Sequence, residues 1–251
     1  MKIATNNFDD KLLVGEGGFG RVYKGFIDDC NRTVAIKRLK LKPGQGLVFK
    51  DLRTEVVLLC QLRHPNLVPL IGYCIDEGEN SLVYEFIVNR NLFRKLYYTD
   101  HDEHDRLSWK QRLRICIGVA RAVHYLHTGV KHTIIHGDVK PANILLNEKW
   151  EAKLSDFKLS KMVPPECRIT SGLTDVYSFG VVLFEVVLCK IHQWRLISLA
   201  QKGKREWSFN KKIDPYPKGK IAPECFKVYM DIATSCVQNE GKDRPTMNKW
   251  R

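Results

Sequence analysis

Short runs of alternating or β-branched hydrophobic residues dominate the first third of the chain, and this pattern is typical of β-strands. Two apolar runs flank a glycine-rich turn in LLVGEGGFGRVYKGFI (12–27), so we expect a hairpin there. Three further strands are expected in RTVAIKRLK (32–40), LVPLIGYCID (67–76) and NSLVYEFIV (80–88). One helix interrupts them in 46–62, where apolar residues recur at the spacing of a single helical face, namely Val48, Leu52, Val56 and Leu59.

Beyond Asn89 the hydrophobic residues recur with the period of an α-helix. A long helix is predicted after the N-cap Ser108, and Gly129 is its expected end. Two more helices are expected in 174–190 and 222–238. The fold class is therefore α+β, with a small antiparallel β lobe and one main helix followed by a larger, mainly helical lobe. The change of pattern near Phe86–Asn89 divides the chain into an N-terminal lobe (1–86) and a C-terminal lobe (87–251).

Charge and cysteine usage narrow the class of protein. The 251 residues carry a formal net charge of +13, which favours anionic partners such as nucleotide phosphates, acidic proteins or a negative membrane face, although solvated surface lysines give the same number. No basic–aromatic pattern of a nucleic-acid-binding protein occurs. Eight scattered cysteines without a CxxC pair predict a reducing compartment rather than a disulfide or zinc scaffold.

No segment has the pattern of a signal peptide or a membrane span. The N-terminus lacks an apolar core, and the longest apolar run, YSFGVVLFEVVLC, is too short to cross a bilayer and contains Glu185. We therefore expect a soluble, cytoplasmic chain.

The sequence GEGGFGRV places Gly15, Gly17, Gly20 and Val22 in the pattern GxGxxGxV. Glycines let backbone N–H groups approach phosphates closely, but a glycine-rich hairpin or a dinucleotide-binding fold has similar strings. The dinucleotide fingerprint should open a helix, whereas a predicted strand follows here. No acidic residue occurs where that fold binds the ribose.

Two charged residues fit a phosphate site next to this loop. Lys37 ends VAIK on the neighbouring predicted strand, where its side chain can reach the phosphates. Glu55 lies on the following helix and can pair with Lys37 to hold it in place. The alternative is a surface ion pair, which contributes little.

The segments HGDVKPANIL and SDFK supply the residues for phosphoryl transfer. Asp138 is the candidate to accept the proton of a substrate hydroxyl, and Lys140 to neutralise the phosphoryl group in flight. Asn143 and Asp156 are the candidates to hold magnesium ions at the phosphates. The order and spacing of the set are specific, although no member is specific alone.

These motifs, together with ATNNF, LRHPNLVPLIGYC, LVYEFI, DVYSFGVVLFEV and DRPTM, resemble the eukaryotic protein kinases. Within them the chain is similar to the Pelle-related plant receptor-like kinases, and KGKIAPECFK to their Feronia-like, malectin-domain group. The resemblance implies a bilobal fold that binds Mg–ATP between its lobes. The DVKPAN pattern implies serine/threonine specificity.

The resemblance also implies roles for individual residues. Tyr84 would be the gatekeeper, and Glu85–Ile87 the hinge that receives adenine. The implied catalytic residues are Asp138, Lys140 and Asn143, and the implied metal ligands are Asn143 and Asp156. The implied ATP-binding residues are Gly15, Gly17, Gly20, Val22, Ala35, Lys37, Glu55, Tyr84, Glu85 and Ile87. The implied partners are protein substrates or signalling proteins, with association with membrane receptors at the inner face of the plasma membrane left open.

Three features depart from the family pattern. Gly137 replaces the arginine that would bind a phosphorylated activation loop, and Lys158 replaces the glycine after Asp156–Phe157. The activation segment is short, because only ten positions separate Asp156 from Glu166, where the family has roughly three times as many.

We interpret Pro165–Glu166 as the family's Pro–Glu landmark, with Glu166 paired to Arg244 and Asp175 bracing the catalytic loop. A chance match of this Pro–Glu pair is the alternative. A second shortening is expected between VVLCK and KKIDPYPKGK, and the last helix is expected to be cut at Arg251.

Histidine clusters offer a weaker, competing signal. HDEHD (101–105) has the residue types of a metal site but reads as a polar loop, while His124 and His127 are interpreted as packing residues. His136 is expected to support the catalytic loop. The functional alternatives are a Ser/Thr kinase with impaired activity, a pseudokinase that acts as a nucleotide-binding scaffold, and a truncated gene product that folds poorly.

Overall fold

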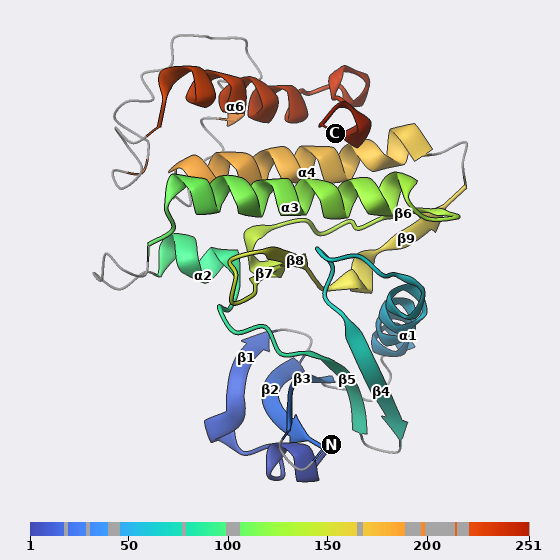
Figure 1. Cartoon of the computed structure of the whole chain (residues 1–251). Helices are drawn as coiled ribbons and strands as arrows, with labels where there is room; N and C mark the ends of the chain where they lie inside the picture. The colour runs from blue at the N-terminus through green and yellow to red at the C-terminus, as the bar shows by residue number, and fades with distance from the viewer. Residues whose placement is uncertain are drawn as a thin grey trace.

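A five-stranded antiparallel sheet forms the first part of the chain, and one helix packs beside it (Figure 1). The structure is a computed structural model that describes residues 1–17, 20–28, 31–39, 46–76, 79–98, 106–164, 168–188, 197–198, 214 and 221–250. The strands are β1 (Leu13–Gly17), β2 (Gly20–Ile27), β3 (Arg32–Leu39), β4 (Leu70–Asp76) and β5 (Glu79–Glu85), in the order β1-β2-β3-β5-β4. Helix α1 (Gly46–Gln61) contacts β4.

The side chains of β3 alternate between the two faces of the sheet. Val34 and Ile36 are fully buried in a small core with Phe8, Tyr23 and Val83. Residues between them in sequence point to the opposite face, because side chains alternate along a strand. This alternation directs Lys37 away from the small core, toward the side on which α1 lies.

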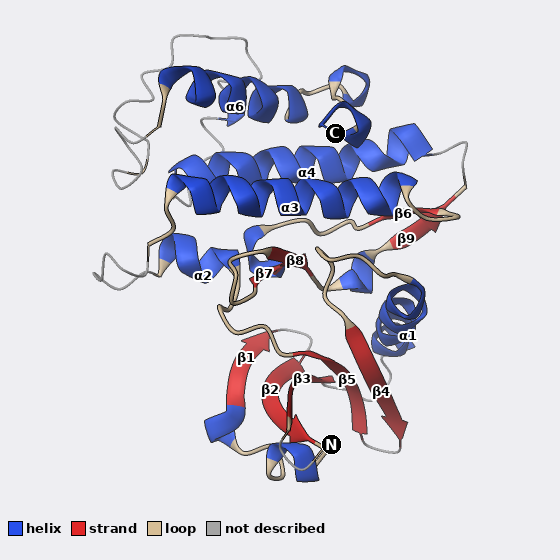
Figure 2. Ribbon diagram, viewed as in Figure 1, coloured by secondary structure: helices blue, strands red, loops and turns tan. Residues whose placement is uncertain are grey.

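The second part of the chain is mainly helical, as Figure 2 shows. Its helices are α2 (Leu92–Tyr97), α3 (Trp109–Thr128), α4 (Arg168–Leu188) and α6 (Pro223–Cys236). The predicted bounds of α3 are confirmed: the N–H of Gln111 donates to Ser108 Oγ, the N–H of Ser108 donates back to Gln111 Oε1, and Gly129 follows the last turn.

Helix α4 begins earlier than the sequence predicted. We expected it from about Thr174, but its first residue is Arg168. Gly172 lies close against the ring of His127 on α3, and Leu173 is buried. The helix therefore includes six residues, 168–173, that precede the predicted start, and Gly172 and Leu173 among them are buried.

Two short antiparallel pairs, which the sequence did not predict, shape the region between the lobes. Strand β6 (Thr133–Ile135) pairs with β9 (Lys161–Val163), and β7 (Ile144–Leu146) pairs with β8 (Ala152–Leu154). Single 3-10 turns complete the described structure: η1 (Ile3–Thr5), η2 (Asp10–Leu12), η4 (Pro141–Asn143), η5 (Phe157–Leu159), η8 (Gly241–Asp243) and η9 (Met247–Trp250).

The predicted α+β, bilobal fold is confirmed, with the sheet and α1 on one side and the helical lobe on the other (Figure 2). The chain passes between them after β5, which ends at Glu85, and before α2, which begins at Leu92. The exact division at residue 86 remains a prediction. Phe157 is fully buried in the main core, between α1 and the helical lobe, so the core reaches the site that lies between the lobes.

Candidate active site

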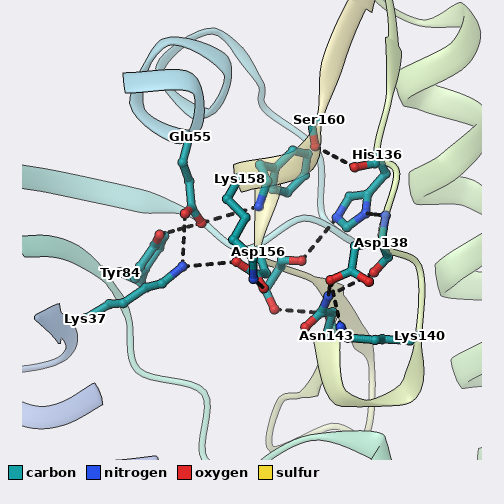
Figure 3. A network of polar contacts seen from close by, with 12 residues as sticks. Lys37, Glu55, Tyr84, His136, Asp138, Lys140, Asn143, Asp156, Lys158 and Ser160 are labelled. Atoms are coloured by element: carbon teal, nitrogen blue, oxygen red, sulfur yellow. Dashed lines mark hydrogen bonds and ion pairs between the residues drawn. The ribbon is translucent and has the colours of Figure 1, made fainter. Parts of the chain in front are cut away.

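The residues that sequence analysis singled out for phosphoryl transfer meet between the two lobes, as Figure 3 shows. They come from elements far apart in the sequence, and buried strands and helices position each of them. The contributing residues are Lys37 from β3, Glu55 from α1, Tyr84 from β5, Asp138 and Lys140 from the loop after β6, Asn143 from η4, and Asp156 from the turn after β8.

Lys37 lies between two carboxylates. Its Nζ is 3.0 Å from Glu55 Oε2 and 3.1 Å from Asp156 Oδ1. Burial by itself would lower the pKa of Lys37, but the charges of Glu55 and Asp156 outweigh it and raise that pKa, so the side chain stays cationic. The pair expected between Lys37 and Glu55 is therefore present, and its lysine also contacts Asp156.

Tyr84 adds a contact that the sequence did not predict. Its hydroxyl donates a 2.6 Å hydrogen bond to Glu55 Oε1, and the backbone N–H of Phe157 lies 3.4 Å from the same oxygen. Burial and the Glu55 charge raise the pKa of Tyr84 well above its usual value, which keeps the hydroxyl protonated as a donor. The Glu55 carboxylate is thus held at both oxygens, with Lys37 on the other one.

A second cluster surrounds Asp138. Lys140 Nζ lies 2.7 Å from Asp138 Oδ2, and the amide nitrogen of Asn143 donates to the same oxygen at 2.9 Å and to the Asp138 carbonyl at 2.8 Å. The Lys140 side chain is half exposed, so its ammonium group is accessible from solvent. Because the amide nitrogen of Asn143 is engaged with Asp138, its amide oxygen is the atom left to face a cation.

Asp175, fully buried on α4, holds the loop that carries Asp138. It accepts hydrogen bonds from the backbone N–H groups of His136 and Gly137, both at 2.8 Å, and its Oδ2 lies 2.9 Å from His127 Nε2. The expectation that Asp175 braces this loop is confirmed by these contacts. His127, interpreted from the sequence as a packing residue, belongs to the same network.

His136 supports the loop from inside. The backbone N–H of Asp138 donates to His136 Nδ1 at 3.2 Å, and Nε2 lies 3.1 Å from the carbonyl of Ser155. Burial lowers the pKa of His136, so the neutral ring that this pattern requires is favoured. Ser155, which no sequence signal identified, also donates through Oγ to the carbonyl of Asn143 at 3.0 Å.

Gly137 occupies a backbone conformation that suits glycine. Its φ is +78°, and a Cβ added there would lie 3.0 Å from the carbonyl oxygen of Leu159. Residues with a Cβ pay a steric cost at positive φ. Gly137, which replaces the arginine of the family pattern, therefore fits this backbone conformation better than a residue with a Cβ would.

Asp156 lies in a tight turn with φ 70° and ψ 68°, immediately before η5. Lys37 binds its Oδ1, and Lys158, two residues later, binds its Oδ2 through Nζ. Burial would raise the pKa of Asp156, but the two lysine charges outweigh it and lower that pKa. Lys158, which departs from the family pattern, is therefore a direct partner of this carboxylate.

The glycine-rich segment belongs to the hairpin of β1 and β2, and β2 pairs with the strand that carries Lys37. Gly17 and Gly20 are paired at the end of the β1–β2 hairpin, and Val22 lies opposite Lys37. Gly20 has φ +149°, and a Cβ there would overlap the Arg38 carbonyl, so its glycine is needed for packing. Gly17, by contrast, has no described atom within 4 Å of the position of a Cβ, which leaves room for a ligand.

The residues expected around adenine lie along the edge where the lobes join. Ala35 pairs with Tyr84 across β3 and β5. Glu85, at the end of β5, is exposed, and Ile87 is buried just beyond it. Gly15 lies on β1, opposite Val22. Strand pairing thus connects Gly15, Val22, Ala35 and Tyr84 to the strand that carries Lys37, and the ATP-binding roles of this set stay predictions.

Some expectations fall outside the described residues. Pro165, Glu166 and the segment 101–105 belong to this group, so the pairing of Glu166 with Arg244 stays a prediction. The Arg244 guanidinium donates to the carbonyls of Gln238, Leu173 and Asn239 and also lies over the Tyr177 ring. Within the described part of the chain, no group of His, Cys, Asp and Glu has the arrangement of a metal site, and no helix has the length and apolarity of a membrane span.

Comparison with known proteins agrees with the site. The protein kinase domain family matches residues 8–173. Receptor-like protein kinase FERONIA of Arabidopsis thaliana is 44% identical over 277 residues, covering 98% of this chain and 30% of that protein. ANXUR2 of the same plant is 45% identical over 277 residues (98% and 32%), and THESEUS 1 is 43% identical over 274 residues (97% and 31%).

The chain spans about a third of the length of these relatives. The aligned stretch of 277 residues is also longer than the 251-residue chain, so these relatives have residues within it that this chain lacks. That difference agrees with the shortened segments expected from the sequence.

Proposed function

Since the chain belongs to the protein kinase family and is similar over nearly its whole length to Feronia-like plant receptor-like kinases, we propose that it is a serine/threonine protein kinase with impaired activity. In this proposal it binds ATP between its lobes and transfers the γ-phosphate to protein hydroxyls. The observation that carries it is the meeting of Lys37, Glu55 and Asp156 beside the Asp138–Lys140 cluster.

The geometry supports a role for each charged residue. Lys37, held by Glu55, contacts the phosphates of ATP. Asp138 accepts the proton of the substrate hydroxyl through Oδ1, because Oδ2 already binds Lys140 and Asn143. The hydroxyl oxygen forms a bond to the γ-phosphorus, the bond from that phosphorus to ADP breaks, and Lys140 offsets the charge of the phosphoryl group in transit.

Magnesium fits this site poorly. Asn143 and Asp156 are the oxygen-bearing residues that such an ion prefers, and the family generally uses Mg–ATP. Both carboxylate oxygens of Asp156 are nevertheless bound by ammonium groups, from Lys37 and Lys158. We therefore derive no step through a metal at Asp156, and we attribute the impaired activity to this arrangement together with the short activation segment.

The partners and location are proposed from the relatives. Several of them are named receptor-like protein kinases, which favours protein substrates or signalling partners for this chain. We propose that it acts in the cytoplasm, at the inner face of the plasma membrane where membrane receptors present their internal segments. Serine/threonine specificity is proposed from the DVKPAN pattern around Asp138 and Asn143.

A second candidate is a pseudokinase that binds nucleotide and signals as a scaffold. The contact of Lys158 with Asp156 favours it, because transfer depends on the position and charge of Asp156. The two candidates share the nucleotide site and differ in turnover.

Transfer of radiolabelled phosphate from ATP by the purified chain, to itself and to a generic protein substrate, distinguishes these candidates. Autophosphorylation above an Asp138→Asn control supports the kinase. We expect slow transfer to the added substrate, and a gain of at least about tenfold when Lys158→Gly is combined with a full-length family activation segment. Nucleotide binding with transfer no faster than in Asp138→Asn would support the scaffold instead.

A further inference from the structure

Lys158 is placed so that its charge lies inside the site rather than in solvent. The single turn η5 follows Asp156 and brings the side chain back toward the carboxylate (Figure 3). The Lys158 side chain is 9% exposed and that of Asp156 is 18% exposed, so this is not a surface ion pair. Buried pairs of this kind resist screening by salt, unlike exposed ones.

The carboxylate of Asp156 carries two cations, one on each oxygen. Lys37 Nζ is 3.1 Å from Oδ1, and Lys158 Nζ contacts Oδ2. With Glu55, Asp138 and Lys140, the site contains three positive and three negative side chains. A glycine in place of Lys158 would leave this group one negative charge in excess, which is the electrostatic condition that favours a divalent cation.

A divalent ion would have to displace Lys158 to bind Oδ2 of Asp156. The ammonium is attached two residues away, so its local concentration at the carboxylate far exceeds that of an ion in solution. The displaced ammonium would then remain beside the ion and Lys37, where like charges repel. Both effects oppose metal binding at Asp156.

We propose that Lys158 is a built-in cation that takes the place of a divalent metal on Asp156, so that this site binds the triphosphate of ATP without requiring the metal. This inference rests on the proposed function, which supplies the nucleotide. The positive charges of Lys37 and Lys158 converge on one carboxylate, at the place to which the phosphates are assigned. The ligand class is therefore a metal-free nucleoside triphosphate.

The test measures nucleotide affinity with a fluorescent ATP analogue, once with excess EDTA and once with saturating magnesium. We compare the wild-type chain with Lys158→Met, which removes the charge but keeps most of the volume, and with Lys158→Arg, which keeps the charge. Lys161→Met is the matched control, because Lys161 is exposed on β9, three residues along. Circular dichroism checks that each variant is folded.

The wild type, Lys158→Arg and the control should bind the analogue with dissociation constants that differ by less than about threefold between the two conditions, whereas Lys158→Met should lose about tenfold in EDTA. In a second readout, electron paramagnetic resonance of Mn²⁺ should show tighter Mn²⁺ binding to Lys158→Met than to wild type. Equal metal dependence of wild type and Lys158→Met, or equal Mn²⁺ affinity, overturns the inference and leaves the proposed function standing. Absence of nucleotide binding to the wild type in both conditions overturns both.

Discussion

Tyr84 donates a 2.6 Å hydrogen bond to Glu55, and this contact links the strand at the lobe junction to the helix that holds Lys37. Glu55 is 2% exposed, so its carboxylate depends on the donors around it. The position of Lys37 is therefore fixed indirectly by a tyrosine hydroxyl on a different element.

Replacing Tyr84 with phenylalanine should weaken this arrangement. Tyr84→Phe removes one donor from a buried carboxylate, and we expect the free energy of unfolding to fall by about 1–3 kcal/mol. Urea denaturation measures this change. Tyr73→Phe is the control, since Tyr73 is about half exposed on β4 and its change should be close to zero. Equal effects of both substitutions would mean that the Tyr84 hydrogen bond does not stabilise the chain.

Restoring the family arginine at Gly137 should destabilise the chain rather than repair it. The cost comes from the backbone at φ +78° and from the close approach of a Cβ to Leu159, so Gly137→Ala and Gly137→Arg should both lose about 1–2 kcal/mol. Gly72→Ala on β4, where a Cβ meets no described atom within 4 Å, is the matched control for urea denaturation. A Gly137→Arg variant as stable as wild type contradicts this account.

Asp175→Asn should disrupt the loop that carries Asp138. The amide has one acceptor oxygen, so the two backbone donors of His136 and Gly137 cannot both be satisfied as they are by the carboxylate. We expect a loss of about 3 kcal/mol in the free energy of unfolding. Asp231→Asn, at an exposed position of α6, should change it by less than about 0.5 kcal/mol in the same assay.

Ser160 is the single hydroxyl residue between Phe157 and Pro164, and phosphorylation there should not regulate the protein. Its side chain is buried, and Oγ donates a 2.9 Å hydrogen bond to the His136 carbonyl, so the hydroxyl is not presented to an enzyme. Ser160→Ala should cost about 1 kcal/mol of stability. Intact mass spectrometry after incubation with ATP should give the same phosphate count for Ser160→Ala and wild type, and a phosphate mapped to Ser160 would contradict this prediction.

The sequence predicted the elements whose boundaries depend on interactions between residues close together in the chain. Ser108 and Gly129 delimited α3 because a capping box and a terminal glycine act within a few residues. The early start of α4 depends on packing of Gly172 and Leu173, which neighbouring residues do not encode. The three-residue strands β6 and β9 are too short to show a period.

The residues of the candidate site likewise fall into those that the sequence identified and those that depend on the fold. The spacing of the motifs identified Lys37, Asp138 and Asp156, because fixed offsets along the chain carry that information. The bond from Tyr84 to Glu55 joins residues 29 positions apart and depends on how β5 meets α1. Likewise, the sequence indicated an unusual positive charge at Lys158, but the direction in which this side chain points follows from the turn at Asp156.

The pairing of β9 with β6 has a mechanical consequence. Strand β6 leads directly into the loop of Asp138, and β9 follows Asp156 and Lys158. The backbone hydrogen bonds of this pairing join Thr133, Ile134 and Ile135 to Val163, Met162 and Lys161. A displacement of either strand is therefore passed to the other, so that the loop of Asp138 and the turn of Asp156 shift together rather than independently.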